Sequence, residues 1–245
     1  MANERQIKEA VILCGGKGTR LKTVVADVPK PLAPIGEKPF LSILMDYLQK
    51  QGVQRVVLAT GYMHETIERT YGKSYRDIEI AYSRELNPLG TGGAVAMALR
   101  KVSSREVLVL NGDSIIMFNL AETAKRYFEI KESFPDIQFP TLLSLKQMEN
   151  VDRYGAVSFE DGRIKAFEEK AFREKCFINA GVYVIDKNTF AHRAEGEFFS
   201  FEKDFLEPEV KKGSLFGIES KGFFIDIGVP EDYALARDIL MRQTD

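Results

Sequence analysis

A glycine-rich segment directly follows the first apolar run of the chain. The run 10–13 is typical of a buried strand, and Gly-Gly-Lys-Gly-Thr-Arg-Leu comes after it at residues 15–21. Glycines lack the Cβ that keeps a ligand away from the backbone, and successive N–H groups form a concave anion site. Because Lys17 and Arg20 add positive charge, the segment predicts a loop that binds a polyphosphate.

The loop departs from both common phosphate-binding patterns. Leu21 stands where the dinucleotide-binding fingerprint needs its third glycine, and the P-loop spacing is absent from the loop. Residues 72–74 match the end of a P-loop, but Ile67 takes the place of its first glycine. On the glycines alone, a phosphate loop and a plain structural turn are equally supported.

Two aspartates follow predicted strands in similar positions. Asp113 comes after the strand 107–110, and Asp226 lies near the end of the apolar segment 222–227, just before Gly228. Mg²⁺ typically uses one or two carboxylates plus phosphate oxygens. Each aspartate alone is better explained as the cap of a turn. Two of them together with a phosphate loop favour a Mg²⁺ site.

A lysine and a second glycine-rich turn are further candidates for nucleotide contact. Pro29 and Pro31 restrict the backbone on both sides of Lys30, so ordering this lysine against a phosphate costs less entropy. A solvated lysine in a proline-rich turn is the simpler explanation of that tripeptide. The turn 87–94 opens a helix, where backbone groups can contact a nucleobase or an anion. A helix cap at Thr91, with glycines for tight packing, is the alternative.

The elements that must position these residues alternate through the first half of the chain. Apolar periodicity predicts strands at 11–13, 53–59, 78–82 and 107–110, and helices at 40–51, 64–71 and 92–100. Pro39 before the first helix and Gly52 after it are typical of helix boundaries. This alternation predicts parallel strands with helices on both faces, and ligands bind beyond the carboxyl ends of such strands.

The second half changes character. Short segments with strand patterns occur at 141–145, 156–159, 164–167, 182–185, 215–219 and 223–227, and a closing helix is predicted at 230–241. Asp161-Gly162 between two of these strands predicts a hairpin. We therefore expect one α/β domain with a doubly wound, mainly parallel, Rossmann-like sheet and a smaller antiparallel lobe. The two lobes are expected to divide at about residue 130.

Composition indicates an ordinary globular protein. The 245 residues are 44% hydrophobic and 29% charged, and the net charge of −2 gives no reason to expect nucleic-acid binding. Cys14 and Cys176 fit neither a disulfide framework nor a zinc pattern. No apolar run approaches the ~18 residues of a membrane span. The first residues lack the apolar core of a signal peptide, so a cytoplasmic location is expected.

A series of motifs along nearly the whole chain resembles the sugar-1-phosphate nucleotidylyltransferases, also called nucleotide-sugar pyrophosphorylases. The motifs occur in the family's order at residues 15–21, 29–31, 90–94, 111–113, 169–170, 179–181 and 226–228. The resemblance implies a nucleotidyltransferase fold over residues 1–245, with a nucleotide-binding lobe at 1–130, a sugar-phosphate lobe at 131–245 and Mg²⁺ as cofactor. The hexapeptide β-helix of some members has no counterpart, so acetyl transfer is not expected.

The resemblance also implies roles for individual residues. Catalytic roles fall to Arg20, Lys30, Asp113 and Lys170, and the metal ligands are Asp113 and Asp226. Nucleotide contacts are expected from Leu13, Gly15, Gly16, Gly18, Thr19, Arg20, Leu89, Gly90, Thr91, Asn111 and Gly112. Contacts to the sugar phosphate are expected from Asp152, Arg153, Tyr154, Gly155, Glu169, Lys170 and Asn179.

Two segments resemble particular members of the family. The turn 89–94 is similar to the guanine-reading form, which predicts GTP over UTP and dTTP and leaves CTP and ATP open. The run 146–155 resembles guanylyltransferases that act on D-glycero-α-D-manno-heptose 1-phosphate, with mannose 1-phosphate as the alternative sugar. Asp152 or Arg153 is the candidate partner for the extra heptose hydroxyl, and a surface salt bridge between them is the simpler alternative. A homodimer is left open.

The expected chemistry is attack of a sugar phosphate on the α-phosphorus of a nucleoside triphosphate, helped by positioning and charge neutralisation. A non-catalytic nucleotide-sugar sensor would not need to keep Arg20, Lys30 and the two metal aspartates. A dehydrogenase is disfavoured by Leu21. A hydrolase triad is poorly supported, because His64 and His192 are the only histidines and no Gly-x-Ser-x-Gly motif occurs.

Overall fold

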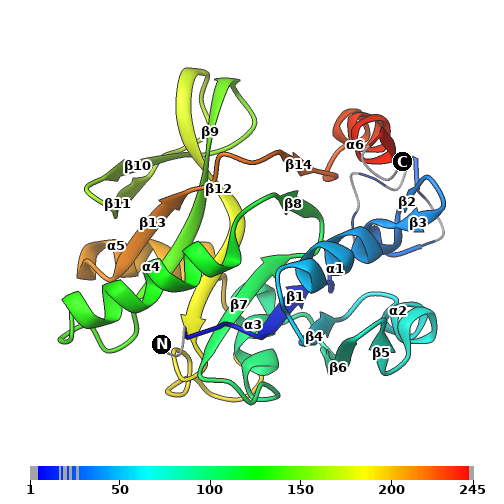
Figure 1. The fold of residues 1–245 in the computed structure, drawn as a ribbon, viewed down its shortest axis with the longest axis horizontal. Helices are drawn as coiled ribbons and strands as arrows, with labels where there is room; N and C mark the ends of the chain where they lie inside the picture. Colours follow the sequence, from blue (N-terminus) through cyan, green and yellow to red (C-terminus); the bar gives the residue numbers. More distant parts are fainter. Residues whose placement is uncertain (1–4, 17, 19–20, 22–23, 26–27, 243–245) are drawn as a thin grey trace.

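The structure, a computed structural model, describes residues 5–16, 18, 21, 24–25 and 28–242 (Figure 1). The helices are α1 (Phe40–Lys50), α2 (His64–Tyr71), α3 (Gly90–Leu99), α4 (Leu120–Ser133), α5 (Glu207–Lys212) and α6 (Pro230–Arg242), with a 3-10 turn η1 (Lys30–Leu32) and a π-helical turn η2 (Glu202–Leu206). The strands are β1 (Glu9–Leu13), β2 (Pro34–Ile35), β3 (Lys38–Pro39), β4 (Arg55–Thr60), β5 (Ser74–Tyr75), β6 (Ile78–Arg84), β7 (Glu106–Asn111), β8 (Ser114–Ile116), β9 (Thr141–Val151), β10 (Ala156–Glu160), β11 (Arg163–Phe167), β12 (Arg173–Asp186), β13 (Leu215–Glu219) and β14 (Phe224–Asp226).

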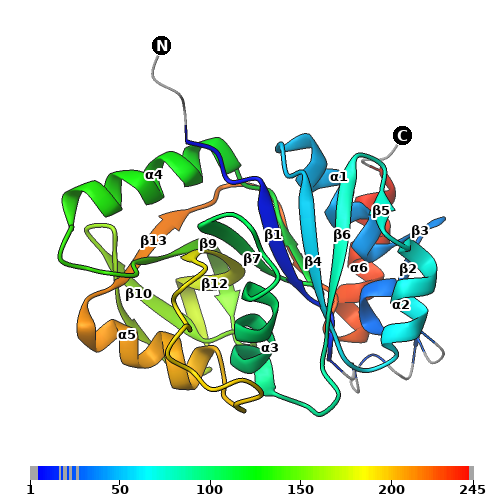
Figure 2. The same ribbon diagram turned by 90° about the horizontal axis from the view of Figure 1, so that it is seen from below.

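β1 is buried on both faces, which explains its continuous apolar sequence. Ala10 and Ile12 enter one hydrophobic core, and Val11 enters the other, because side chains alternate along a strand. The first core lies against α1, α2, α4 and α6, and the second against α3 and η2. Figure 2 shows α4 and α3 on opposite sides of the strands. Helices therefore cover both faces, as predicted.

The sheet as a whole is mixed. Four strands are parallel in the order β6-β4-β1-β7, and β12 continues the sheet antiparallel to β7. The register of β12 against β9 shifts between Asn179 and Tyr183. Before this shift β12 also pairs with β10, and β10, β11, β13 and β9 complete a small barrel. The α/β class is as expected, but the sheet is mixed and not the doubly wound, mainly parallel sheet that the sequence predicted.

Several boundaries follow from local chemistry. α1 lies between Pro39 and Gly52, whose φ of 91° is accessible to glycine. Asp161 and Gly162 both have positive φ, at 50° and 76°, which is what a tight hairpin turn requires. Helix α4 was not predicted, although the side chain of Asn119 caps it by accepting the N–H of Glu122 at 3.1 Å. Strands β9 and β12 are also longer than the segments predicted for them.

A separate two-stranded sheet joins distant parts of the chain. β8 directly follows Asp113 and pairs antiparallel with β14, with Ser114 opposite Asp226. The N–H of Ile227 donates to the carbonyl oxygen of Asp113 at 2.8 Å. This pairing brings the two predicted metal ligands to one place.

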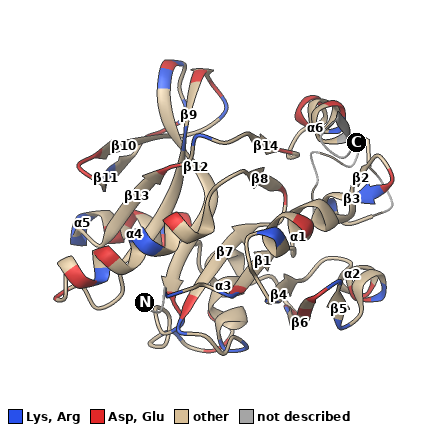
Figure 3. Ribbon diagram, in the orientation of Figure 1, with Lys and Arg blue, Asp and Glu red and all other residues tan. Residues whose placement is uncertain are grey.

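Acidic and basic residues are interspersed along the helices and strands (Figure 3). Within the described part of the chain, no helix combines the length and the apolar character that crossing a bilayer requires.

Candidate active site

A cavity of about 820 Å³ lies at the carboxyl ends of the parallel strands, a size typical of small-molecule sites. Its walls come from the ends of β1 and β7, from η1, from the β4–α2 turn and from the segment between β6 and α3. The lining residues are Leu13, Cys14, Gly15, Gly16, Lys30, Pro31, Gly61, Tyr62, Glu85, Leu86, Asn87, Pro88, Gly90, Thr91, Ala94, Asn111, Gly112 and Asp113.

Most residues expected to bind a nucleotide line this cavity. They are Leu13, Gly15, Gly16, Gly90, Thr91, Asn111 and Gly112. Leu89 and Gly18 lie next to lining residues but do not themselves line the cavity. Thr19 and Arg20 are outside the residues that the structure describes, so their predicted roles remain predictions.

Two glycines allow chain segments to meet closely beside the cavity. The N–H of Gly112 donates to the carbonyl oxygen of Leu13 at 3.0 Å, and a Cβ on Gly112 would overlap that oxygen. A Cβ on Gly15 would lie 2.9 Å from Oε1 of Glu85. Gly112 therefore requires glycine, because a Cβ there would meet backbone, whereas the contact at Gly15 is with the movable end of a side chain.

Lys30 lies between the two predicted metal ligands. Its Nζ is 2.5 Å from Oδ2 of Asp113 and 3.9 Å from Oδ1 of Asp226. The Lys30 side chain is only 10% exposed, so it is not the solvated lysine of the simpler explanation. Gly18, with a φ of 57°, packs beside the Cβ of Lys30. The structure therefore brings the glycine loop, the lysine and both aspartates together.

The charge of Asp226 is only partly compensated. Burial raises the pKa of Asp226, and the neighbouring Asp113 carboxylate raises it further. The ammonium of Lys30 and the N–H of Gly228, which donates to Oδ1 of Asp226 at 2.5 Å, act in the opposite direction. Two carboxylates and one ammonium leave net negative charge at the edge of the cavity.

This donor set fits a divalent cation. Asp113 and Asp226 supply carboxylate oxygens, the ligands that Mg²⁺ prefers, and Mg²⁺ usually completes its shell with water and phosphate oxygens. Among the described residues, no cluster of three or more His, Cys, Asp and Glu side chains could hold a metal. Two protein carboxylates therefore suit a metal that also binds the phosphates of a substrate.

Glu85 belongs to the cavity wall and was missed in the sequence interpretation. Its Oε2 accepts the N–H of Leu89 at 2.9 Å, and burial raises the pKa of Glu85 despite this bond. The available signal was its position shortly after the predicted strand 78–82, and it directly follows β6 at the same edge of the sheet as Asp113. A half-buried carboxylate with one hydrogen bond keeps acceptor capacity for a ligand.

The second glycine-rich turn, residues 87–94, is hydrogen-bonded to another segment of the same chain. α3 begins at Gly90, so the predicted helix cap at Thr91 is wrong. The N–H groups of Gly92 and Gly93 donate to the carbonyl oxygen of Phe199 at 3.0 and 3.3 Å. These two N–H groups are thus occupied within the chain, and tight packing explains the glycines. Gly90 and Thr91 still line the cavity.

The residues expected to bind a sugar phosphate lie outside this cavity. Glu169 and Lys170 are exposed beyond the end of β11. Asn179 lies at the register shift of β12, where its amide donates to the Tyr183 hydroxyl at 2.8 Å and accepts the N–H of Gly181 at 3.1 Å. Asn179 therefore supports the local backbone.

The turn after β9 lies near the metal ligands. Tyr154 packs edge-on against Phe224 with ring centroids 5.9 Å apart, and Phe224 belongs to the strand that ends in Asp226. Burial raises the pKa of Tyr154, and the Asp226 carboxylate raises it further. A Cβ on Gly155 would lie 2.8 Å from the carbonyl oxygen of Glu168, so this turn also requires glycine.

Arg153 pairs with Asp232 rather than with Asp152. Its Nη2 lies 2.7 Å from Oδ1 of Asp232 on α6, while Asp152 is exposed. The alternative of a salt bridge between Arg153 and Asp152 is therefore wrong, and the predicted contact with the heptose hydroxyl stays a prediction. Arg153 instead ties the β9–β10 turn to α6, and an ion pair with one half-exposed partner is worth under ~1 kcal/mol.

Known proteins resemble this chain over nearly all of its length. The sequence profile described as Nucleotidyl transferase matches residues 9–243. The D-glycero-alpha-D-manno-heptose 1-phosphate guanylyltransferase of Aneurinibacillus thermoaerophilus is 44% identical, covering 94% of this chain and 96% of that protein. The protein of the same name from Campylobacter jejuni is 43% identical, covering 92% and 96%. The crystal structure of HddC from Yersinia pseudotuberculosis complexed with GMP-PN has a TM-score of 0.80 at 34% identity, covering 96% of this chain and 100% of that one.

Proposed function

The chain belongs to the nucleotidyl transferase family, and from that premise we propose that it transfers GMP from GTP to D-glycero-α-D-manno-heptose 1-phosphate and releases pyrophosphate. The reaction class rests on Lys30 between Asp113 and Asp226 at the edge of the cavity. The sugar is supported by the two relatives that carry this activity in their names.

In the proposed reaction, an oxygen of the sugar phosphate attacks the α-phosphorus of GTP. A new P–O bond forms while the bond to the bridging oxygen breaks, and the electron pair leaves with pyrophosphate. The nucleophile is already an anion, so no side chain has to remove a proton. The protein contributes positioning and neutralisation of negative charge. Lys30 supplies a fixed ammonium, and the glycine loop with Arg20 is assigned to the β- and γ-phosphates.

Asp113 and Asp226 are the residues that would hold Mg²⁺, and the bound ion would neutralise charge that develops on the transferred phosphoryl group. Contacts to the sugar phosphate are assigned to the predicted set that includes Glu169, Lys170 and Asn179. The division into a nucleotide-binding lobe at 1–130 and a sugar-phosphate lobe at 131–245, together with a cytoplasmic location, belongs to the same proposal.

Glu85 supports guanine as the base. Guanine presents two adjacent N–H donors on its pairing edge, and one carboxylate can accept from both. Uracil and thymine place carbonyl oxygens beside their single N–H, which would face the negative charge of Glu85. Because burial makes an unpaired polar group costly, the wrong base would be rejected strongly.

The test is a matrix of activities with purified protein and Mg²⁺. GTP, ATP, CTP, UTP and dTTP are each combined with heptose, mannose and glucose 1-phosphates, and pyrophosphate release is measured. We expect the highest kcat/KM with GTP and the heptose. A preference for UTP or dTTP would refute the base, and a preference for mannose 1-phosphate would make the protein a mannose-1-phosphate guanylyltransferase. Binding of a nucleotide sugar without any turnover would indicate a sensor.

A further inference from the structure

The segment 197–201, here called the strap, is bound to the first turn of α3. The N–H of Phe199 donates to the carbonyl oxygen of Leu89 at 3.0 Å, and the N–H of Phe201 donates to Oγ1 of Thr91 at 3.0 Å. Figure 2 shows the chain between β12 and α5 passing beside α3. The strap comes from the second half of the chain, yet it holds the turn that forms one wall of the nucleotide cavity.

The strap lies so close to this turn that Gly90, Gly92 and Gly93 have no room for a side chain. A Cβ on Gly90 would lie 2.5 Å from the carbonyl oxygen of Phe199, and a Cβ on Gly93 would lie 2.5 Å from that of Glu197. A Cβ on Gly92 would overlap the ring of Phe199. The strap therefore shapes this wall of the cavity. The same contacts hold the strap in place beside the first turn of α3.

Two exposed apolar side chains lie at this side of the cavity, here called the rim: Leu86 lines the cavity, and Phe198 lies beside the lining residue Gly90. Leu86 is 93% exposed and lines the cavity next to Glu85. Phe198, on the strap, is 71% exposed, and its Cε2 lies 3.5 Å from the place of a Cβ on Gly90. Gly90 is itself a lining residue. Large apolar groups in this position lower their contact with water when a ligand covers them.

We propose that Phe198 stacks on the guanine of bound GTP and that Leu86 covers a further part of the base. This inference rests on the proposed function, in which Glu85 pairs with the edge of guanine. A base held by its edge leaves two flat apolar faces, and aromatic side chains stack on such faces whatever the base. Phe198 thus adds affinity for the nucleotide, while Glu85 supplies the selection for guanine.

A fluorescence titration tests the contact without relying on turnover. The sequence has no tryptophan, so Phe198→Trp introduces a single reporter at the rim. We expect GTP to quench its emission saturably, and we expect no response from Leu235→Trp, a control at an exposed apolar position on α6. Quenching by another triphosphate but not by GTP would support stacking and refute the guanine assignment. No response to any triphosphate would overturn the stacking role of Phe198.

Steady-state kinetics give a second, independent result. Phe198→Ala should raise the KM for GTP roughly tenfold, because a stacked base loses its platform. The kcat and the KM for the sugar phosphate should stay within about twofold of the wild type, since these depend on other groups. Phe198→Tyr keeps the ring and should restore the KM, and Leu235→Ala should match the wild type.

Two outcomes of the kinetic experiment would contradict the proposal. A lower kcat with an unchanged KM for GTP would mean that Phe198 acts elsewhere in the reaction. An altered oligomeric state of Phe198→Ala in gel filtration, with an unchanged KM for GTP, would make the rim a contact between copies of the chain instead.

Discussion

At the amino ends of β1 and β7 the acidic side chains are fully paired within the chain. At the opposite edge of the sheet, where the parallel strands have their carboxyl ends, Glu85 after β6 and Asp226 on β14 are only partly paired. Glu9, the first residue of β1, is 4% exposed and accepts hydrogen bonds from the N–H groups of Ser103 and Ser104 and from Arg55. Burial opposes its charge, but these bonds outweigh the burial and lower the pKa of Glu9.

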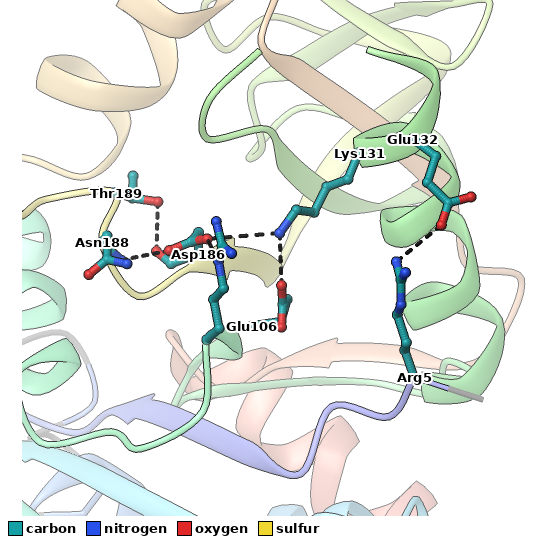
Figure 4. Close-up of polar contacts among 8 residues, drawn as sticks. Arg5, Glu106, Lys131, Glu132, Asp186, Asn188 and Thr189 are labelled. Carbon is teal, nitrogen blue, oxygen red and sulfur yellow. Dashed lines mark hydrogen bonds and ion pairs between the residues drawn. The ribbon is translucent and has the colours of Figure 1, made fainter. Parts of the chain in front are cut away.

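Asp186 at the end of β12 repeats this arrangement (Figure 4). Its Oδ2 lies 2.8 Å from Nε of Arg105, and its Oδ1 accepts the N–H of Asn188 at 2.9 Å. Lys131 reaches from α4 to Glu106 at 2.8 Å and to Asp186 at 3.9 Å. Each buried acid at this end has its partners inside the chain.

The acids at the carboxyl end differ in this respect. Burial raises the pKa of Asp226 and of Glu85, and each accepts one backbone N–H group. The nearby Lys30 is shared between Asp226 and Asp113. Uncompensated acids in a cavity are candidates for ligand binding, because a cation or a donor from the ligand completes their environment. We therefore expect acids at the amino end to contribute to stability and acids at the carboxyl end to contribute to ligand binding.

The largest expected effect comes from removing a carboxylate at the carboxyl end. Asp113→Asn keeps the shape but deletes a ligand charge, and kcat should fall by at least about 100-fold, as for other preorganised electrostatic groups. Pyrophosphate release at saturating Mg²⁺ measures this change. Asp136→Asn, at an exposed position outside both regions, is the control. Near-normal turnover of Asp113→Asn would remove the metal assignment.

Removing an acid at the amino end should lower the stability of the fold and leave turnover unchanged. Glu9→Ala leaves the N–H groups of Ser103 and Ser104 without their acceptor and removes one of the partners of Arg55, which should cost about 2 kcal/mol of unfolding free energy. The Tm should fall by roughly 4–8 °C, with turnover per folded molecule unchanged. Thermal unfolding and activity are measured on the same samples. Lost turnover at an unchanged Tm would show that the two ends are not functionally distinct.

Glu85 should make GTP binding sensitive to acid. Because burial holds the pKa of Glu85 above its usual range, falling pH protonates this carboxylate while ordinary surface carboxylates are still ionised. The KM for GTP should therefore rise toward acidic pH. Glu85→Gln should raise this KM roughly tenfold at neutral pH and remove that pH dependence. An identical pH profile in the wild type and in Glu85→Gln would refute the role of Glu85.

The smallest effect is a gain in stability. A carboxyl group with a raised pKa binds its proton more tightly in the folded chain, so its ionised form destabilises the fold at neutral pH. Asp226→Asn should therefore raise the Tm slightly while abolishing most activity. The difference from the wild type should shrink as pH falls toward the pKa of Asp226. A lower Tm for Asp226→Asn at neutral pH would contradict the inference that the charge of Asp226 destabilises the fold.

Most of the residues that line the cavity could be predicted because their signals are local. The glycines follow the apolar strand β1, and Asp113 follows β7. Parallel strands present their carboxyl ends at one edge of the sheet, so these residues meet there. Glu85 follows β6 in the same manner, but a single glutamate after a strand lacks the glycines that made the other turns stand out.

The sugar side could not be placed in the same way. Arg153 and Asp152 are neighbours in sequence, yet Arg153 reaches Asp232 on a helix 79 positions later. β12 pairs with β7, β9 and β10 because its register shifts within one strand, and no periodicity in the sequence reports such a shift. The antiparallel pairing predicted for this second lobe is present, because β12 pairs antiparallel with β9 and β10. The prediction of a mainly parallel sheet failed because these strands continue the same ten-stranded sheet.

By itself, the sequence determined where strands and helices alternate in the first half, that glycines follow the first strand and which family the motifs resemble, since periodicity and turn chemistry act over a few residues. Only the tertiary structure decided that β8 and β14 pair to bring Asp226 beside Asp113. It also decided that the carbonyl oxygen of Phe199 accepts N–H groups from the first turn of α3. These contacts join segments far apart in the chain. Their geometry depends on how all the strands pack, and no local pattern encodes it.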